Sequence, residues 1–251
     1  MRVVAVVGGD GTVHEAVNGL MRADAPRRPE LALLPQGSGD DFARALGVRG
    51  DEAAALAVVR EGAVRELDVG RADYAASDGS RATGYFASMA GTGMSGAVAR
   101  RLNETTKVLG GRTAGLLATL AVFRRWQNVD LTVDIDGETI RGKMEDVLVA
   151  NTEFHNGGMR LCPGAVPDDG IFDVLLIGDV TKRDLALNLP KLYRGTFLPH
   201  PRAELRRGRR IGIESDTALP IELDGEQPGT TPVTFGIVAR ALKVRVPSNR
   251  S

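Results

Sequence analysis

The sequence has few of the features that are typical of disulfide-linked, zinc-binding or membrane-spanning proteins. A single cysteine, Cys162, excludes an internal disulfide and fits a reducing compartment. The three histidines, His14, His155 and His200, lie far apart and have no cysteine partner at ligand spacing, which argues against a zinc site. The longest apolar run, at 114–123, is too short to span a bilayer.

An excess of charge and a leader segment are also missing. Lys+Arg and Asp+Glu number 32 each, so no global field argues for nucleic acid as a partner. No charged-then-apolar leader precedes the first expected strand, so we expect a protein that is not secreted. The 251 residues, 43% of them hydrophobic, are enough for one large or two small domains. These features predict a globular, cytoplasmic protein.

The first third of the chain alternates strand and helix patterns. A continuous apolar run at 3–7 predicts a strand buried on both faces of a parallel sheet. Apolar residues then recur at helical spacing from Val13 to Met21. A second buried strand is expected at 31–34, followed by helices at 38–46 and 51–60. This alternation is typical of an α/β architecture.

From about residue 64 the pattern changes to short alternating strands with polar punctuation. Strands are expected at 129–135, 171–177, 210–215, 219–226 and 234–246. Helices are expected at 93–103, 114–126 and 182–193. The Asp136-Gly137 pair after the first of these strands predicts a hairpin.

The change of pattern predicts two domains with a boundary near 66–68. An α/β domain would cover residues 1–66, and its last strand would return at about 239–251. A mostly antiparallel β domain would cover residues 67–238.

The first strand runs into a glycine-rich turn, GGDGT at 8–12. Its glycines let backbone N–H groups approach an anion closely, and the following helix adds partial positive charge. Thr12 and Glu15 form a capping-box pattern that predicts where this helix begins. Asp10 is unusual, because a carboxylate in a phosphate-binding turn repels the ligand unless it holds a metal or accepts a proton. An ordinary tight turn between strand and helix stays an alternative interpretation.

A second strand, glycine-rich turn and helix follow in LLPQGSGDDFARALG at 33–47, where Ser38 is a candidate helix cap. Neither turn is a Walker A motif or a GxGxxG fingerprint. In a parallel sheet, the loops that follow successive strands gather at the same carboxyl edge. The pair of turns therefore predicts one shared nucleotide site.

These motifs resemble the catalytic domain of the diacylglycerol kinase and sphingosine kinase family, in its bacterial soluble lipid-kinase branch. GGDGTVHEAVNGL and LPQGSGDDFARALG carry the resemblance. GGMRLCPGAVPDDGIFDVLLI at 157–177 and IELDGE at 221–226 agree with later family motifs in the same order. The resemblance runs from residue 1 to the end of the chain. It implies an NAD-kinase-like α/β domain followed by an antiparallel β-rich, sandwich-like domain, with ATP in the cleft between them.

The resemblance also implies roles for individual residues. ATP phosphates and ribose would be contacted by Ser38 and by the first turn, which comprises Gly8, Gly9, Asp10, Gly11, Thr12, Val13 and His14. Asp10 would lie near a catalytic Mg²⁺. A structural Mg²⁺ would be held by the Asp169 carboxylate and the backbone carbonyls of Val166 and Ile171, since hard oxygen ligands suit that ion. The triplet from Asp224 to Glu226 would supply the base that takes a lipid hydroxyl proton.

The implied activity is an ATP- and Mg²⁺-dependent lipid kinase, most simply one that converts diacylglycerol to phosphatidic acid at the inner membrane face. Carboxylates, magnesium and backbone amides suit this chemistry, because phosphoryl transfer mainly needs positioning and charge neutralisation. A homodimer is left open. NAD kinase also uses GGDGT, although the second turn here lacks the Leu-Gly-Phe continuation of that family. A nucleotide-binding regulatory remnant without activity is the other alternative.

The sequence departs from the family pattern in three ways. Asp40 stands where the family usually has Asn, and Ser38 replaces the usual Thr. Two further βα units, including an Asn-Pro-x-Ser-Gly phosphate loop, would precede residue 1, on the order of 50–60 residues by the size of such units. The strand at 3–7 would then be an inner strand with an open hydrogen-bonding edge. A coding start further upstream and a truncated enzyme both explain this.

Four weaker signals have two interpretations each. The triplet DGE occurs at 136–138 as well as 224–226, and a plain hairpin turn explains both. The arginine-rich stretch at 202–212 fits a strand edge guarded by charge, or anionic lipid headgroups. The segment 91–96 fits core packing or an acyl-chain entrance. His155 fits a structural role or a place in the cleft.

Overall fold

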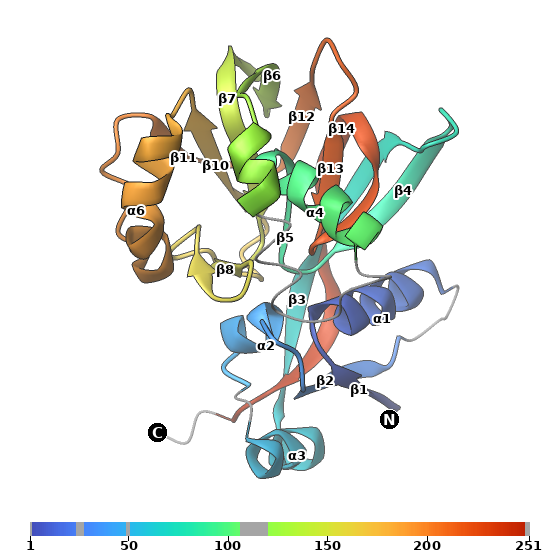
Figure 1. The fold of residues 1–251 in the computed structure, drawn as a ribbon. Helices are drawn as coiled ribbons and strands as arrows, with labels where there is room; N and C mark the ends of the chain where they lie inside the picture. Colours follow the sequence, from blue (N-terminus) through green and yellow to red (C-terminus); the bar gives the residue numbers. More distant parts are fainter. Residues whose placement is uncertain (1, 24–27, 49–50, 106–119, 249–251) are drawn as a thin grey trace.

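The computed structural model describes residues 2–23, 28–48, 51–105 and 120–248. Its labelled helices are α1 (Asp10–Arg22), α2 (Asp41–Ala45), α3 (Glu52–Glu61), α4 (Met94–Thr105) and α6 (Lys182–Arg194). Its strands are β1 (Val3–Gly8), β2 (Glu30–Pro35), β3 (Ala63–Ala75), β4 (Arg81–Phe86), β5 (Met89–Gly93), β6 (Val129–Ile135), β7 (Glu138–Ala150), β8 (Phe154–His155), β9 (Met159–Arg160), β10 (Phe172–Gly178), β11 (Ala203–Gly208), β12 (Arg210–Glu214), β13 (Pro220–Leu223) and β14 (Glu226–Val246). Figure 1 shows two halves joined by β3 and β14.

The N-terminal half is built on a short parallel sheet. β1 and β2 are parallel, from Val3 opposite Glu30 to Gly8 opposite Pro35, and β2 is also parallel to the end of β14. β2 has a neighbouring strand on either side and is covered by helices, so its first four residues are buried. This burial agrees with the mostly apolar composition of the strand. The apolar face of α1 packs on this sheet through Val13, Val17 and Met21.

The pair formed by β3 and β14 runs through both halves (Figure 1). The two strands are antiparallel from Ala63 opposite Val246 to Ala75 opposite Thr230. Their register shifts between Val238 and Leu242, where the backbone N–H of Arg240 donates to Asp68 over 2.7 Å. The boundary predicted at 66–68 therefore falls within a continuous strand, and it stays a prediction.

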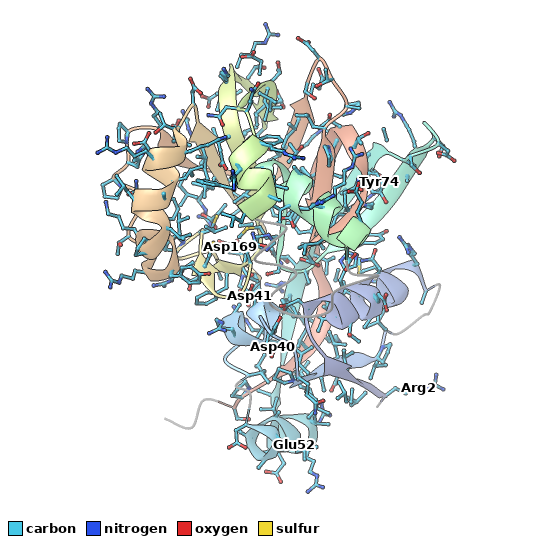
Figure 2. All side chains as sticks on the ribbon, in the orientation of Figure 1. Arg2, Asp40, Asp41, Glu52, Tyr74 and Asp169 are labelled. Carbon is cyan, nitrogen blue, oxygen red and sulfur yellow. The ribbon has the colours of Figure 1, made fainter. Side chains whose placement is uncertain are left out.

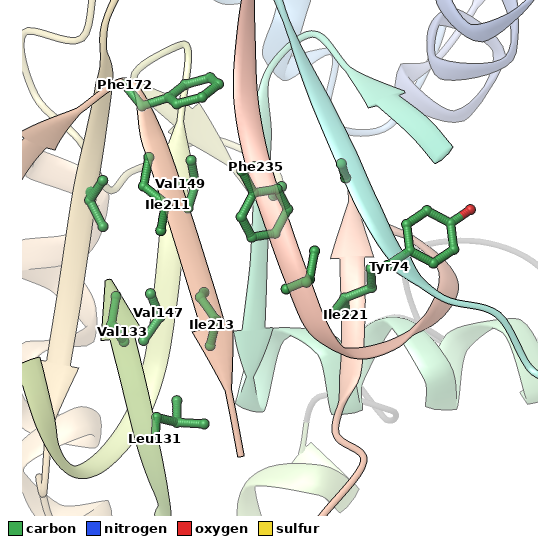
Figure 3. Packing of buried hydrophobic residues seen from close by; sticks show 14 of the residues in the cluster. Tyr74, Leu131, Val133, Val147, Val149, Phe172, Ile211, Ile213, Ile221 and Phe235 are labelled. Carbon is green, nitrogen blue, oxygen red and sulfur yellow. The ribbon is translucent and has the colours of Figure 1, made fainter. Parts of the chain in front are cut away.

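The C-terminal half is a large antiparallel sheet that folds over its own core. β14, β12, β6, β7, β10 and β11 are consecutive neighbours, and β4 and β5 reach the sheet through β3, β13 and β7. Phe86 of β4 stacks on Phe172 of β10 at 5.6 Å and meets Phe235 of β14 edge-on at 5.8 Å, although none of these strands pairs with another of the three. Figure 3 shows this core between facing strands. The expected sandwich-like character is thus present.

Most of the predicted elements are found close to their expected bounds. The hairpin at Asp136-Gly137 joins β6 to β7, and both residues have positive φ, 52° and 95°. The helix expected at 114–126 falls partly outside the described residues; residues 120–125 are helical. Every helix within the described ranges falls short of the length and apolar character that a membrane crossing requires.

The prediction that the first strand is buried on both faces is wrong. Val3, Val4 and Val7 are 38%, 37% and 53% exposed. The reason is that, among the described residues, β1 pairs only with β2 and has an open edge on its other side. An open edge at this strand is what the family resemblance implied.

Two predicted helix starts are also wrong. α1 begins at Asp10 with Gly9 as its N-cap, so Thr12 and Glu15 lie inside the helix and form no capping box. α2 begins at Asp41 and not at Ser38, because Asp40 takes a left-handed conformation at φ 52° that a helix cannot include. Both glycine-rich turns are therefore followed at once by an aspartate in the first turn of a helix.

Candidate active site

The two glycine-rich turns touch each other at the carboxyl ends of β1 and β2. A Cβ atom on Gly37 would lie 2.5 Å from the Cα of Gly9, and one on Gly9 would lie 2.9 Å from the Cα of Gly37. The backbone N–H of Gln36 donates to the carbonyl of Gly8 over 3.1 Å. Only glycine permits this contact between backbones. The structure thus brings together the two turns that the sequence predicts to share one site.

Three carboxylates gather beside these turns. Asp10 accepts a hydrogen bond from the N–H of Phe42 over 3.2 Å, and Asp40 accepts from the N–H of Gly37 at 2.9 and 3.1 Å. Asp41 is buried and accepts from the N–H of Gly157, in the C-terminal half, over 2.7 Å. Figure 2 labels Asp40 and Asp41 at the start of α2, where the two halves meet.

Burial and mutual repulsion disfavour ionisation at this cluster. Burial, and then the charge of Asp10, raise the pKa of both Asp40 and Asp41. Among the described residues, the Oδ1 atom of Asp41 is buried without a hydrogen-bond partner, and Arg44 lies 3.8 Å from it. A divalent cation would supply the missing partner and relieve the repulsion, so Asp10 and Asp41 fit such an ion. No set of three ligating side chains encloses a metal in the described part of the chain, as expected where Mg²⁺ takes much of its shell from substrate phosphates.

The Asp224 carboxylate is engaged at every acceptor position. Its Oδ1 accepts the N–H groups of Ser88 and Met89 over 2.9 and 3.1 Å. Its Oδ2 accepts the N–H of Ala87 over 2.9 Å and contacts Nδ1 of His14 at 3.2 Å. A carboxylate has about four lone-pair sites, so none is left to take a substrate proton. Asp224 therefore fixes the turn between β13 and β14 to the segment after β4 and to α1.

Glu226 lies in the same turn with a different environment. It is exposed, and its carboxylate has no hydrogen bond to any described residue. Its Oε1 lies 3.5 Å from the point where a Cβ on Gly11 would stand, so the carboxylate faces the first turn of α1. Of the two predicted bases in this turn, Glu226 is the one with acceptor positions available.

His14 is oriented from both sides. The amide of Asn18 is fixed by the backbone of Tyr85, which donates to its Oδ1 over 3.1 Å and accepts from its Nδ2 over 2.8 Å. This places Nδ2 at 3.3 Å from Nε2 of His14, while Nδ1 of His14 lies 3.2 Å from the Asp224 carboxylate. Burial lowers the pKa of His14, but the hydrogen bond and charge of Asp224 outweigh it and raise that pKa.

A buried ion pair lies behind the turn. His155 and Glu222 are 5% and 1% exposed, with Nε2 and Oε1 2.8 Å apart. Burial lowers the pKa of His155, but Glu222 and then Asp41 raise it to about 9. The other oxygen of Glu222 accepts the N–H of Gly225 over 3.0 Å. The pair therefore supports the turn from within, which favours the structural interpretation of His155.

The remaining predicted nucleotide contacts lie around the first turn. Gly11, Thr12 and Ser38 are exposed beside it, where a ligand can reach them. Val13 is 7% exposed and packs in the core, so only its backbone is available. The sequence analysis missed Asp41, although the doubled acid at 40–41 was the available signal. It also missed Asn18 and Glu222, because contacts between distant segments leave no local pattern.

The loop predicted to hold a structural Mg²⁺ is tied by side chains. Asp169 pairs with Arg207 and accepts the N–H of Ile171 over 3.2 Å. Asp168 forms two 2.6 Å hydrogen bonds with Arg65. The Arg207 guanidinium thus contacts one oxygen of the Asp169 carboxylate, and the other oxygen accepts a backbone hydrogen bond. The role of Val166, Asp169 and Ile171 as metal ligands stays a prediction without support from this geometry.

The place of each weaker sequence signal in the fold favours one of its two interpretations. The arginine-rich stretch includes β11, an edge strand whose Arg206 and Arg207 pair with acidic neighbours, as a guarded edge does. All residues of β5 are buried, which favours core packing over an acyl-chain entrance at 91–96. The first DGE triplet is the β6–β7 hairpin, where Glu138 pairs with Arg206.

Comparisons with known proteins agree with this arrangement. Residues 1–72 match the family described as the diacylglycerol kinase catalytic domain, and residues 88–246 match the YegS C-terminal NAD kinase beta sandwich-like domain. Diacylglycerol kinase of Staphylococcus carnosus is 28% identical over 98% of this chain and 77% of its own length. The enzyme of that name from Staphylococcus aureus strain JH9 is 29% identical over 98% and 75%.

Solved structures show the same fold. A putative diacylglycerol kinase from Bacillus anthracis has a TM-score of 0.74 at 24% identity, covering 98% of this chain and 77% of its own. Yeast NADH kinase has a TM-score of 0.50 at 14% identity, covering 99% and 62%, a likeness of fold alone. Because family matches cover both halves of the chain in order, it belongs to the diacylglycerol kinase family of bacterial lipid kinases.

Proposed function

We propose that this protein transfers the γ-phosphoryl group of ATP to the hydroxyl of a membrane lipid, most simply diacylglycerol, giving phosphatidic acid. The observation that carries the proposal is the position of Glu226. This carboxylate has no hydrogen bond among the described residues and faces the start of α1, where Asp10 follows the paired glycine turns. Family membership favours the lipid acceptor.

The N-terminal half would bind the nucleotide. The touching turns and the N-terminus of α1 present backbone N–H groups and partial positive charge to the ATP phosphates. Asp10 and Asp41 would hold Mg²⁺, which when bound with ATP neutralises charge on the phosphates. The repulsion between these carboxylates explains why the site needs a cation before a polyanion can enter it.

The C-terminal half would supply the base. Glu226 takes the proton of the lipid hydroxyl as that oxygen forms its bond to the γ-phosphorus. The bond from the γ-phosphorus to the bridging oxygen breaks, and ADP leaves with that oxygen. Asp224 takes no proton in this account, because four donors occupy its acceptor positions. It acts as a positioning residue for the turn.

The lipid that accepts the phosphoryl group and the ATP that donates it together indicate where the reaction would occur. A diacylglycerol is held in a bilayer, whereas ATP is a cytoplasmic solute. The enzyme would therefore work as a peripheral protein at the inner membrane face.

The test is isotope transfer from γ-labelled ATP to mixed micelles that contain diacylglycerol, with NAD offered in parallel. We expect Mg²⁺-dependent label in the lipid and none in the dinucleotide. Label in NAD alone would favour NAD kinase chemistry, and no labelled product from either acceptor would favour a regulatory remnant. Asp10→Ala should abolish transfer while thermal unfolding stays unchanged. Turnover retained in this variant would contradict the role of Asp10.

A further inference from the structure

Helix α6 (Lys182–Arg194) lies on the outside of the C-terminal half (Figure 1). It begins at a capping box formed by Thr181 and Asp184 and ends at Gly195 with φ 66°, so both ends are well defined. Leu185, Asn188 and Leu192 recur at helical spacing and line an apolar pocket against the sheet. One face of α6 therefore rests on the protein, and no residue of the helix is buried.

The solvent-exposed side of α6 carries three large apolar side chains. Leu187, Leu189 and Tyr193 are 65%, 45% and 49% exposed. Single exposed leucines are ordinary in folded proteins. Leu189 and Tyr193, four positions apart, are neighbours along one flank of the exposed side, whereas Leu187 points to a different side of the helix. A helix that exposes large apolar side chains around its solvent side is suited to contact with an apolar partner.

Cations accompany these apolar side chains, without acidic partners among the described residues. Arg183, Lys191 and Arg194 are exposed, and their side chains form no hydrogen bond or ion pair with any described residue. The one acid of the helix, Asp184, lies on the inner side and bonds to Thr181. We call these six residues, Arg183, Leu187, Leu189, Lys191, Tyr193 and Arg194, the α6 outer face.

We propose that the α6 outer face binds an anionic lipid bilayer and places the active site at the membrane. A helix with exposed apolar and basic side chains lies in the interface plane, with apolar groups among the acyl chains and cations at the headgroups. The proposal rests on the proposed lipid acceptor, because docking brings the enzyme to that substrate.

The position of α6 supports this role. α6 packs against β9, and the hairpin of β8 and β9 carries Gly157, which donates to Asp41 of α2. α6 therefore stands beside the hairpin that borders the proposed site. A second copy of the chain is a poorer occupant, because two such faces would bring unpaired cations together.

The test measures sedimentation of the full-length protein with sucrose-loaded vesicles, without ATP. One vesicle type is phosphatidylcholine mixed with phosphatidylglycerol, and the other is phosphatidylcholine alone. The variant is Leu187→Glu/Lys191→Glu. Its matched control is Leu56→Glu/Arg60→Glu on α3, where an exposed leucine and an exposed arginine have the same spacing and the net charge changes equally.

We expect wild type to prefer the anionic vesicles, the α6 variant to bind them at least about tenfold more weakly, and the control to stay within about twofold of wild type. Circular dichroism should show equal unfolding temperatures for all three. The proposal is overturned by an α6 variant that binds like wild type, by equal losses in both variants, or by wild type that ignores anionic vesicles. A wild-type dimer that the α6 variant converts to a monomer would assign the face to a second copy.

Phosphoryl transfer to a short-chain diacylglycerol in solution separates this inference from the proposed function. We expect the α6 variant to keep the wild-type rate with that acceptor, since α6 touches no residue of the proposed site. A wild type that binds vesicles but phosphorylates no acceptor would contradict the kinase proposal and support the membrane face. A variant that loses both activities would overturn the assignment of α6 to docking alone.

Discussion

Asp224 and Glu226 stand two positions apart in one turn, yet their carboxylates have opposite surroundings. Asp224 has donors at every acceptor position, whereas Glu226 has none among the described residues. The residue types are equally suited to proton transfer, so only the donors around them distinguish a positioning carboxylate from an available base.

Asp224→Asn is expected to destabilise the fold. The amide replaces one acceptor oxygen with a donor, so either His14 and the N–H of Ala87, or the N–H groups of Ser88 and Met89, lose their partner. The expected loss is about 1–3 kcal/mol in the free energy of unfolding, measured by urea denaturation. Asp136→Asn, in the other DGE turn, affects only solvent-exposed hydrogen bonds from the N–H groups of Arg209 and Arg210, so it should cost less and is the comparison. An Asp224→Asn protein as stable as wild type would contradict the positioning role.

The raised pKa of His155 predicts that the stability of the fold depends on pH. Its pKa is raised from 6.5 to about 9 in the folded protein, mainly against Glu222 and Asp41. The folded state then binds a proton that the unfolded state releases, so this stabilisation is full below pH 6.5 and is lost as pH rises toward about 9. Asp146 acts in the same direction at lower pH, because burial raises its pKa from 3.8 to about 7.

His155→Gln should flatten the decline in stability between pH 6.5 and about 9 and lower stability most at the acid end of that window. The measurement is the urea midpoint of both proteins at several pH values. The same slope in both proteins would show that His155 does not carry the effect.

At the scale of elements, the central contact is that of the two glycine turns. Both turns were predictable, because each follows a buried strand and because loops at one sheet edge must meet. The boundaries of α1 and α2 were not, since they depend on Gly9 as cap and on the left-handed Asp40. Contacts such as Asp41 with Gly157 join segments more than a hundred residues apart, so no local pattern reports them.

Gly37→Ala tests this contact. The added methyl would lie 2.5 Å from the Cα of Gly9 and must push the turns apart. We expect ATP affinity to fall by about tenfold or more, measured by calorimetry, because the phosphate-binding N–H groups no longer converge. Gly142→Ala in β7 meets no atom within 4 Å and should bind ATP like wild type. Equal affinities in both variants would contradict a shared nucleotide site.

At the scale of the whole molecule, β3 and β14 connect the halves and keep their functional groups in register. The N-terminal half contributes Asp10, and the turn that opens β14 contributes Glu226. The order of the halves was predictable from the change of sequence pattern near residue 64. The single β3–β14 ladder that crosses the predicted boundary was not, because hydrogen-bond pairing between strands at opposite ends of the domain has no signature in either strand.

The most direct test of the account compares Glu226→Gln with Glu138→Gln, the corresponding change in the other DGE turn. Both replace a glutamate by its isosteric amide after a tight turn, but only Glu226 faces Asp10 and the glycine turns. Transfer of label from ATP to diacylglycerol should fall by about 100-fold or more in Glu226→Gln, the loss expected for a general base, and stay near the wild-type rate in Glu138→Gln. Undiminished transfer by Glu226→Gln would contradict the account.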